Sequence, residues 1–442
     1  MRVKRLQMTS FRGIENLTLD FHETQPTVLI GINGVGKSSI LDCLAILISG
    51  FICRIKYNPK SGTIFVKMAK QNLFPASEKE RDLAKGRSFN KEDIANDRDK
   101  TNCDLLISIP GTENLALHLN KYRQDKSENT NNKHDKLDMV AKDIREQWKT
   151  SDQFNIPIAV YYPVNRAVFD IDLEIKDNSI YKQIDAYEQA LDGVRISFDS
   201  FFKWFRLIED LENEKLRDNH DYRNRQIEAV RQSIYSIIPE FSNLRVRRSP
   251  LRMTVRKQDE ELIVNQLSDG EKCLLAMVGD LARRLAIANP GLPNPLEGSG
   301  VVMIDEIELH LHPKWQREII PALTETFPNC QFIITTHSPL VISHVKPDSI
   351  YILEKTDDGI VAIHPESSYG RDSNRILEDL MDTSERPQHI KENLQKLFRL
   401  IDDGKLTEAR EMRKYLVDEI GYSEPEFASA DMLIRRKEIL AR

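Results

Sequence analysis

Four short and nearly uninterrupted apolar runs mark the chain: TVLIG (27–31), IPIAVYY (156–162), VVMI (301–304) and FIITT (332–336). Runs of this length without polar alternation are typical of strands that are buried on both faces of a parallel sheet. Longer apolar segments begin at Lys37 and Glu271 and have the length of helices. The pattern therefore predicts an α/β protein with a buried central sheet.

Alternating apolar and polar positions predict further strands. Residues 1–21 read as two strands joined by the turn SFRGI, residues 244–257 as a strand pair, and residues 349–363 as another pair. Paired strands of this kind are antiparallel. We therefore expect a mixed central sheet together with an antiparallel β subdomain.

Helical periodicity dominates residues 171–240 and the C-terminal end of the chain. Each region carries apolar residues spaced so that they share one helical face. These faces consist of Phe198, Phe201, Phe202, Phe205 and Ile208 in the first region, and of Ile390, Leu394, Leu397 and Ile401, then Leu406, Met412 and Leu416, in the second. We expect a compact helical lobe and a helical tail, which either packs onto the protein's own body or docks a partner.

Four parts follow from these segments: residues 1–165, 166–243, 244–365 and 366–442. The first part contains a stretch, residues 56–155, that is rich in Lys, Asn, Asp and Glu and has apolar runs only at 103–109 and 115–119. We expect this stretch to be a polar insertion. Its nearly all-polar segment 121–138 is predicted to be a mobile loop.

Composition narrows the class of protein. The net charge of −6 gives no global attraction to nucleic acid, so any such binding requires a local patch. The five cysteines show no metal-ligand or disulfide spacing, which favours reduced thiols in a cytosol. No signal peptide is expected, and the most apolar stretch, near residues 40–52, is too short to span a bilayer. We expect a cytoplasmic protein without a membrane partner.

A phosphate-binding loop follows the first buried strand. Residues 31–38 satisfy the pattern G-x-x-x-x-G-K-[ST], and they lie between a predicted strand and a predicted helix. Glycines let successive backbone N–H groups point at phosphate oxygens, and the helix N-terminus adds a positive end. The predicted nucleotide-binding residues are Gly31, Asn33, Gly34, Val35, Gly36, Lys37, Ser38 and Ser39. Lys37 supplies a charge between the β and γ phosphates, and Ser38 offers a hydroxyl to Mg²⁺.

Later segments complete a site for ATP and Mg²⁺. The strand VVMI ends in Asp305, which we expect to hold Mg²⁺, and Glu306, which we expect to act as general base. LSDGE (267–271) is similar to the signature sequence of ABC ATPases, which closes over the γ-phosphate held by another copy. Its residues are Leu267, Ser268, Asp269, Gly270 and Glu271. His337, at the end of FIITT, fits the histidine that senses the γ-phosphate.

These motifs carry a family resemblance. FRGI (11–14), LSDGE, IDEIELHLHP (304–313) and TTHSP (335–339) resemble the RecF/SMC/OLD-like branch of ABC-class ATPases. The resemblance implies an ABC-type P-loop head, pairing of two copies across ATP, and a phosphate contact for Arg12, which otherwise reads as a solvated turn residue. The glutamine that the family places after the strand at 156–162 is not evident. Asn165 and Arg166 stand there instead, and their role stays open.

Two further clusters invite a functional interpretation. His310 and His312 lie beside Glu308, but a tetrahedral zinc site needs more ligands than this spacing provides, so we expect no metal there. The strand pair around Pro250 is basic, and four of its arginines are candidate contacts to DNA or phosphate. These are Arg245, Arg247, Arg252 and Arg256. The alternative is a solvated face near acidic helices.

The remaining segments separate this chain from its larger relatives. The interval between Arg166 and Leu267 holds only about 100 residues without persistent heptads, so no long coiled-coil arm is expected. The tail has neither an Asp-x-Asp pair nor an HNH-like cluster, so no nuclease is expected in the sequence. The size, the short lobe and YGRDSNRILEDLM (369–381) resemble the PtuA-type ATPases of the Septu antiphage system, which also occur with retrons.

That resemblance implies a homodimer or higher homo-oligomer that controls a PtuB-like HNH nuclease. In a retron setting it implies DNA and a reverse transcriptase with msDNA as further partners. Two alternatives remain. One is a RecF-like ATPase that binds DNA in repair or recombination, and the other is a slow ATP-dependent assembly scaffold.

Overall fold

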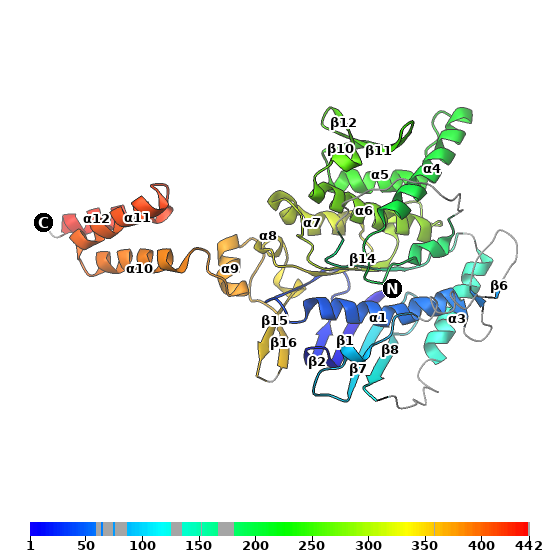
Figure 1. Cartoon of the computed structure of the whole chain (residues 1–442), viewed down its shortest axis with the longest axis horizontal. Coiled ribbons are helices and arrows are strands. Elements are labelled where there is room, and N and C mark those ends of the chain that lie inside the picture. Colours follow the sequence, from blue (N-terminus) through cyan, green and yellow to red (C-terminus); the bar gives the residue numbers. More distant parts are fainter. Residues whose placement is uncertain are drawn as a thin grey trace. The chain divides into compact units, whose positions relative to one another are not determined.

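The structure is a computed structural model that describes residues 1–58, 63–64, 74–75, 86–124, 135–151, 153–166, 181–357 and 359–440. The chain divides into two compact units, Met1–Arg371 and Asp372–Arg442. Figure 1 shows their elements. The boundary falls a few residues after the predicted start of the tail at 366.

A six-stranded mixed sheet forms the centre of the first unit. Its strand order is β16-β15-β3-β14-β13-β9, and every neighbouring pair is parallel except β15 with β16. The strands are β3 (Thr27–Gly31), β9 (Ile158–Tyr162), β13 (Gly300–Ile304), β14 (Cys330–Thr335), β15 (Ile350–Thr356) and β16 (Gly359–Ile363). The four apolar runs are thus the buried strands, as predicted.

A four-stranded antiparallel sheet, in the order β2-β1-β7-β8, lies beside this core. It comprises β1 (Arg2–Phe11), β2 (Ile14–Asp20), β7 (Lys100–Ser108) and β8 (Leu115–Tyr122). Because β7 pairs with β1 along its length, residues 100–122 complete the N-terminal sheet. The prediction of a polar insertion over 56–155 was therefore wrong for these residues, since the partner strand lies about a hundred residues earlier in the chain.

The loop predicted for residues 121–138 needs a similar correction. Residues 121–122 belong to β8, and residues 135–138 begin the helix α3 (Asp135–Thr150). Residues 125–134 lie outside the described residues. Three two-residue strands, β4 (Tyr57–Asn58), β5 (Thr63–Ile64) and β6 (Phe74–Pro75), pair with one another in the first part of the predicted insertion.

The helix α1 (Lys37–Lys56) contacts strands of both sheets, and it therefore lies between them (Figure 1). Within the described residues it is the one helix that is long and apolar enough to cross a membrane. Most of its side chains are buried inside the protein, so its apolar character is that of a core helix. It also packs against α3.

Further helices belong to the first unit. They are α4 (Phe198–Asp218), α5 (Arg225–Ile237), α6 (Asp269–Ala288), α7 (Pro313–Thr326) and α8 (Pro339–Ile342), with short 3-10 turns at Lys91–Asp93, Gln183–Tyr187, Val264–Gln266, Pro295–Glu297 and Pro347–Ser349. The predicted apolar face of α4, Phe198 to Ile208, is buried, and α4 and α5 pack on α6. The compact helical lobe is thus confirmed.

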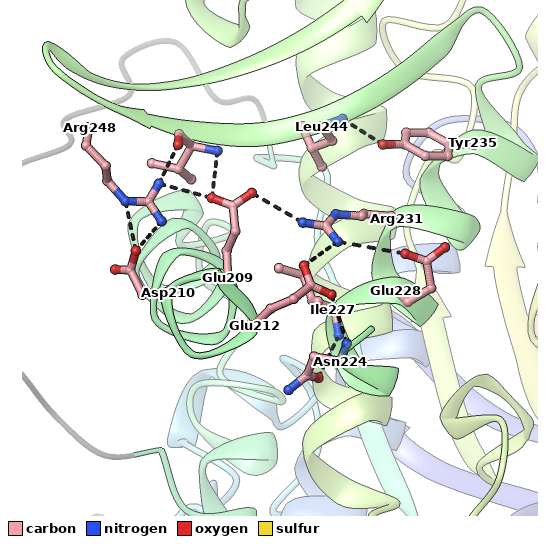
Figure 2. Close-up of polar contacts among 11 residues, drawn as sticks. Glu209, Asp210, Glu212, Asn224, Ile227, Glu228, Arg231, Tyr235, Leu244 and Arg248 are labelled. Carbon is pink, nitrogen blue, oxygen red and sulfur yellow. Dashed lines mark hydrogen bonds and ion pairs between the residues drawn. The ribbon is translucent and has the colours of Figure 1, made fainter. Parts of the chain in front are cut away.

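A three-stranded antiparallel sheet packs against this lobe. Its strands are β10 (Phe241–Arg248), β11 (Leu251–Lys257) and β12 (Glu260–Ile263). Buried carboxylates fasten it to the helices, as Figure 2 shows. Glu209 and Glu212 on α4 both pair with Arg231 on α5, and Glu209 also accepts hydrogen bonds from Arg248 and from the backbone N–H of Val246 on β10. One ionic network therefore fixes α4, α5 and β10 to one another.

The second unit is helical, as predicted. It contains α9 (Ser373–Met381), α10 (Gln388–Asp402), α11 (Leu406–Ile420) and α12 (Pro425–Leu440). The predicted face of α10 joins Leu416, Phe427 and Ile434 in a separate apolar core. The apolar faces of the tail thus pack against one another.

Candidate functional site

The phosphate loop connects β3 to α1 and has the backbone shape that its glycines allow. Gly31, Gly34 and Gly36 have φ of 144°, 80° and 107°, a region that L side chains rarely occupy. A Cβ at Gly31 would lie 2.5 Å from the carbonyl oxygen of Leu353 on β15, so the sheet itself requires glycine there. Asn33, Gly34 and Ser38 are exposed, which leaves the loop open to a ligand.

Lys37 is folded into this loop. The residue is 6% exposed, and its ammonium donates to the carbonyl oxygens of Gly31 at 2.8 Å and Ile32 at 2.9 Å. Burial lowers the pKa of Lys37, and the nearby carboxylates of Asp305, Glu306 and Glu308 oppose that shift. The lysine predicted from the motif therefore lies beside the predicted acids.

The turn after β13 presents these acids. Asp305 is 2% exposed and accepts a hydrogen bond from the hydroxyl of Thr335 on β14. The same hydroxyl accepts from the backbone N–H of Glu306 at 2.7 Å. Glu306 has a φ of 48°, in the left-handed region, and it is half-buried. Thr335 thus orients both acids, a role that the sequence analysis did not assign.

Glu308 connects this turn to the predicted sensor. It accepts hydrogen bonds from the hydroxyl of Thr336 at 2.7 Å and from the backbone N–H of His337. Burial lowers the pKa of His337, and the ammonium of Lys37 adds to the shift, whereas Glu308, Glu306 and Asp305 oppose it. Lys37, Asp305, Glu306 and His337 are therefore brought together in one site.

The signature residues form the start of α6. Ser268 caps the helix and forms a reciprocal capping box with Glu271, whose carboxylate also pairs with Lys257 on β11 at 2.7 Å. Leu267 is buried and Asp269 is exposed. A Cβ at Gly270 would lie 2.2 Å from the carbonyl oxygen of His310, so glycine permits this contact with the loop after the acids.

Asn165 and Arg166, whose role was left open, have different surroundings. The guanidinium of Arg166 is buried and donates to the backbone carbonyl oxygens of Asp305 and Glu306. Asn165 is exposed, and its side chain accepts from Arg195 at 3.3 Å. The arginine of this pair therefore belongs to the site, although its partners lie 139 and 140 residues away in the sequence.

Arg12 is held by carboxylates. Its guanidinium donates to Asp93 at 2.9 Å and to Asp42 on α1, and these partners raise its pKa against the effect of burial. Its φ of 50° places it in a tight turn. The predicted phosphate contact stays a prediction, because these two ion pairs occupy the side chain.

The basic strand pair is largely neutralised. Arg245 and Arg247 both pair with Glu261 on β12, and their hydrogen bonds lower the pKa of that carboxyl to about 2. Of the other two candidates, Arg252 is half-buried and Arg256 is exposed. The strand β12 was not predicted, because its four residues are too few to show alternation.

Of the two histidines after the acids, one caps a helix and the other lies on the surface. His312 caps α7 by accepting from the backbone N–H of Lys314 at 3.3 Å, and His310 is exposed with a φ of 66°. Among the described residues no three His, Cys, Asp or Glu side chains form a group that could hold a metal ion. The hydroxyl of Ser38 and the carboxylate of Asp305 are oxygen donors of the kind that Mg²⁺ prefers, and they would hold that ion if it bound with a nucleotide.

A phosphate loop, two acids after a buried strand, a signature helix and a histidine after the next strand define an ABC-class P-loop ATPase. The chain belongs to the family described as "AAA domain, putative AbiEii toxin, Type IV TA system", whose profile matches residues 27–343.

Several curated proteins are similar over most of their length. The "Retron Vc95 probable ATPase" of Vibrio cholerae serotype O1 biovar El Tor is 30% identical, over 88% of this chain and 80% of that protein. The "Retron Ec83 probable ATPase" of Escherichia coli is 29% identical, over 88% and 78%. The "Septu protein PtuA" of Bacillus thuringiensis is 23% identical, over 88% and 86%. The chain is therefore related to the ATPases of retron and Septu systems.

Among solved structures, an SMC head bound to the C-winged helix domain of ScpA is similar, with a TM-score of 0.47 and 14% identity. The match covers 83% of this chain and 98% of that one. The SMC head domain from Thermotoga maritima is also similar, with a TM-score of 0.37, 17% identity and coverage of 83% and 100%.

Proposed function

We propose that this protein binds and hydrolyses ATP as the regulatory subunit of a cytoplasmic bacterial antiphage complex, in which it controls a partner HNH-type DNA nuclease. The observation that carries the proposal is the convergence of Lys37, Asp305, Glu306 and His337 around one phosphate loop. The retron and Septu names of its relatives support the defence role.

Two copies are proposed to pair across the nucleotide. The charged groups that act on Lys37 belong to the turn after β13. The signature helix instead begins against the carbonyl oxygen of His310, and its Glu271 pairs with Lys257. Ser268 and the N-terminus of α6 would then meet the γ-phosphate bound by the other copy. A monomer would then contain the phosphate loop and acids of one site and the signature of another, but no complete site.

Within each proposed site, this chain's own residues have distinct tasks. The phosphate loop binds and orients the triphosphate, Glu306 accepts the proton of the attacking water, and His337 contacts the γ-phosphate. Mg²⁺, held by Ser38 and Asp305, would supply charge neutralisation for the phosphates. The half-buried position of Glu306 and its fixed backbone suit a base that must be oriented before reaction.

The nuclease is proposed to be a separate protein, because the residues from Asp372 onward form a helical unit with its own apolar core. Copies of this chain would assemble as a dimer or higher oligomer and carry a PtuB-like partner. In a retron setting, DNA and a reverse transcriptase with msDNA would join the complex.

Two variants test the ATPase proposal. Glu306→Gln should trap an ATP-bound dimer with turnover reduced at least about 100-fold, since the general base is lost. Lys37→Ala should abolish nucleotide binding, while Lys142→Ala, at an exposed position on α3, should behave as wild type. Turnover and mass photometry with and without ATP give both readouts. Wild-type turnover in Glu306→Gln would refute the proposal.

A DNA-binding role remains the second candidate, and the exposed side chain of Arg256 favours it. It predicts salt-sensitive binding of DNA by the protein without partners, weakened in an Arg252→Gln, Arg256→Gln double variant. Arg245→Gln should have a smaller effect, because Glu261 already neutralises that side chain. Fluorescence anisotropy at several salt concentrations measures the difference, and equal effects of both changes would contradict it.

A further inference from the structure

Arg166 is a charged side chain enclosed in the protein interior. It is 1% exposed, and its guanidinium donates to the backbone carbonyl oxygens of Asp305 and Glu306. A buried charge is costly unless hydrogen bonds satisfy it, so these contacts fix the position of the side chain. The same contacts hold the turn that presents the two acids.

The charge of Arg166 acts on the signature helix: burial raises the pKa of the Cys273 thiol on α6, and the guanidinium opposes that rise. The strand that leads to Arg166 is hydrogen-bonded to the same helix. The hydroxyl of Tyr162 donates to Asp280 on α6 at 2.9 Å, and the carbonyl oxygen of Tyr162 accepts from the N–H of Asp305 at 2.9 Å.

The beginning of α6 touches the segment after the acids as well. The carbonyl oxygen of His310 approaches Gly270 so closely that a Cβ would lie 2.2 Å from it. The signature helix therefore contacts the segment after the acids at His310 and is linked to Asp305 through Tyr162, so a shift of the helix requires a response from the turn.

We propose that Arg166 is a positioning residue that couples the two nucleotide sites of a dimer, by tying the catalytic turn to the signature helix within one copy. The inference rests on the proposed pairing of two copies. In that dimer the turn of one copy serves one site and its signature serves the other, so a link inside the copy joins both sites.

The chemistry of arginine suits this role. Its planar fork donates to two successive carbonyl groups at once, whereas lysine offers a compact charge on a flexible stem. Glu306 also adopts a left-handed backbone conformation, and the bonds to its carbonyl oxygen and its N–H hold that conformation.

The test compares Arg166→Lys with Arg145→Lys. Arg145 is also buried and donates to a backbone carbonyl oxygen, that of Arg54, but it lies on α3. Arg166→Lys should lower kcat roughly 10- to 100-fold with little change in the affinity for a fluorescent ATP analogue. It should also reduce the Hill coefficient for ATP from above one toward one. Arg145→Lys should change neither quantity by more than about twofold.

The inference is overturned if Arg166→Lys keeps wild-type kcat and Hill coefficient, or if Arg145→Lys shows the same losses. An unfolded Arg166→Lys is replaced by Arg166→Gln, judged by the same criteria. A wild-type Hill coefficient of one would also overturn it. Trapping of the dimer by Glu306→Gln is measured separately. Absence of a trapped dimer would refute the pairing of two copies. A trapped dimer together with an unchanged Hill coefficient in Arg166→Lys would refute only the coupling.

Discussion

At the scale of single residues, the surroundings of His337 influence whether its imidazole is protonated. Its imidazole is half-buried beside Lys37, and both effects favour the neutral form over the cation. A neutral imidazole can donate one hydrogen bond without repelling the lysine ammonium. The neutral histidine therefore adds no positive charge next to Lys37.

The lowered pKa of His337 predicts a pH dependence of stability. The unfolded chain takes up a proton near pH 6.5, whereas the folded protein takes it up at lower pH. Stability from this group is thus present above about pH 6.5 and lost as the pH falls through the folded pKa. His337→Gln should flatten the loss of stability as the pH falls below about 6.5, as measured by urea unfolding of the nucleotide-free protein.

His310→Gln provides the control, because that side chain is exposed. It should leave the pH profile unchanged. An unaltered profile in His337→Gln would show that the shift has no consequence for folding.

The sequence pointed more clearly to the residues proposed to bind phosphate than to the residues that hold these in place. Lys37 and Asp305 lie in patterns whose neighbouring strands are visible from the sequence alone. Arg166, Thr335 and Glu308 act through partners in other segments, and no local pattern reports such contacts. Their roles therefore emerged only from the fold.

At the scale of elements, the same limit explains the strands that were missed. β7 pairs with β1 although the phosphate-loop helix lies between them in the sequence, and β12 is short and begins with two glutamates. The buried strands and the apolar face of α4 were predicted, because burial leaves a continuous or periodic mark on the sequence. Ion pairs such as that of Glu261 leave no such mark.

The network in Figure 2 yields a prediction at this scale. Arg231 neutralises Glu209 and Glu212, which are 4% and 3% exposed. Arg231→Met should destabilise the protein by about 3–5 kcal/mol, because it leaves buried carboxylates with too little positive charge. Denaturant unfolding followed by circular dichroism measures the change in the free energy of unfolding.

Arg206→Met is the matched control. Arg206 and its partner Asp210 both lie on α4, their charged groups are 3.6 Å apart, and Asp210 is more exposed than Glu209 and Glu212. It should cost less than about 1 kcal/mol. Equal losses in both variants would show that the buried network has no special weight.

At the scale of the whole molecule, the two units have separate cores, and this separation has a measurable consequence. Leu397 is fully buried among the helices of the second unit. Leu397→Ala should destabilise that unit by about 2–5 kcal/mol through the lost transfer free energy and the cavity. Nucleotide binding should be unchanged, because Lys37 and the acids belong to the first unit.

Met432→Ala, at an exposed position, is the control. Hydrogen exchange should show faster opening confined to residues after 372 in Leu397→Ala, and faster exchange in α1 as well would mean that the two units unfold together.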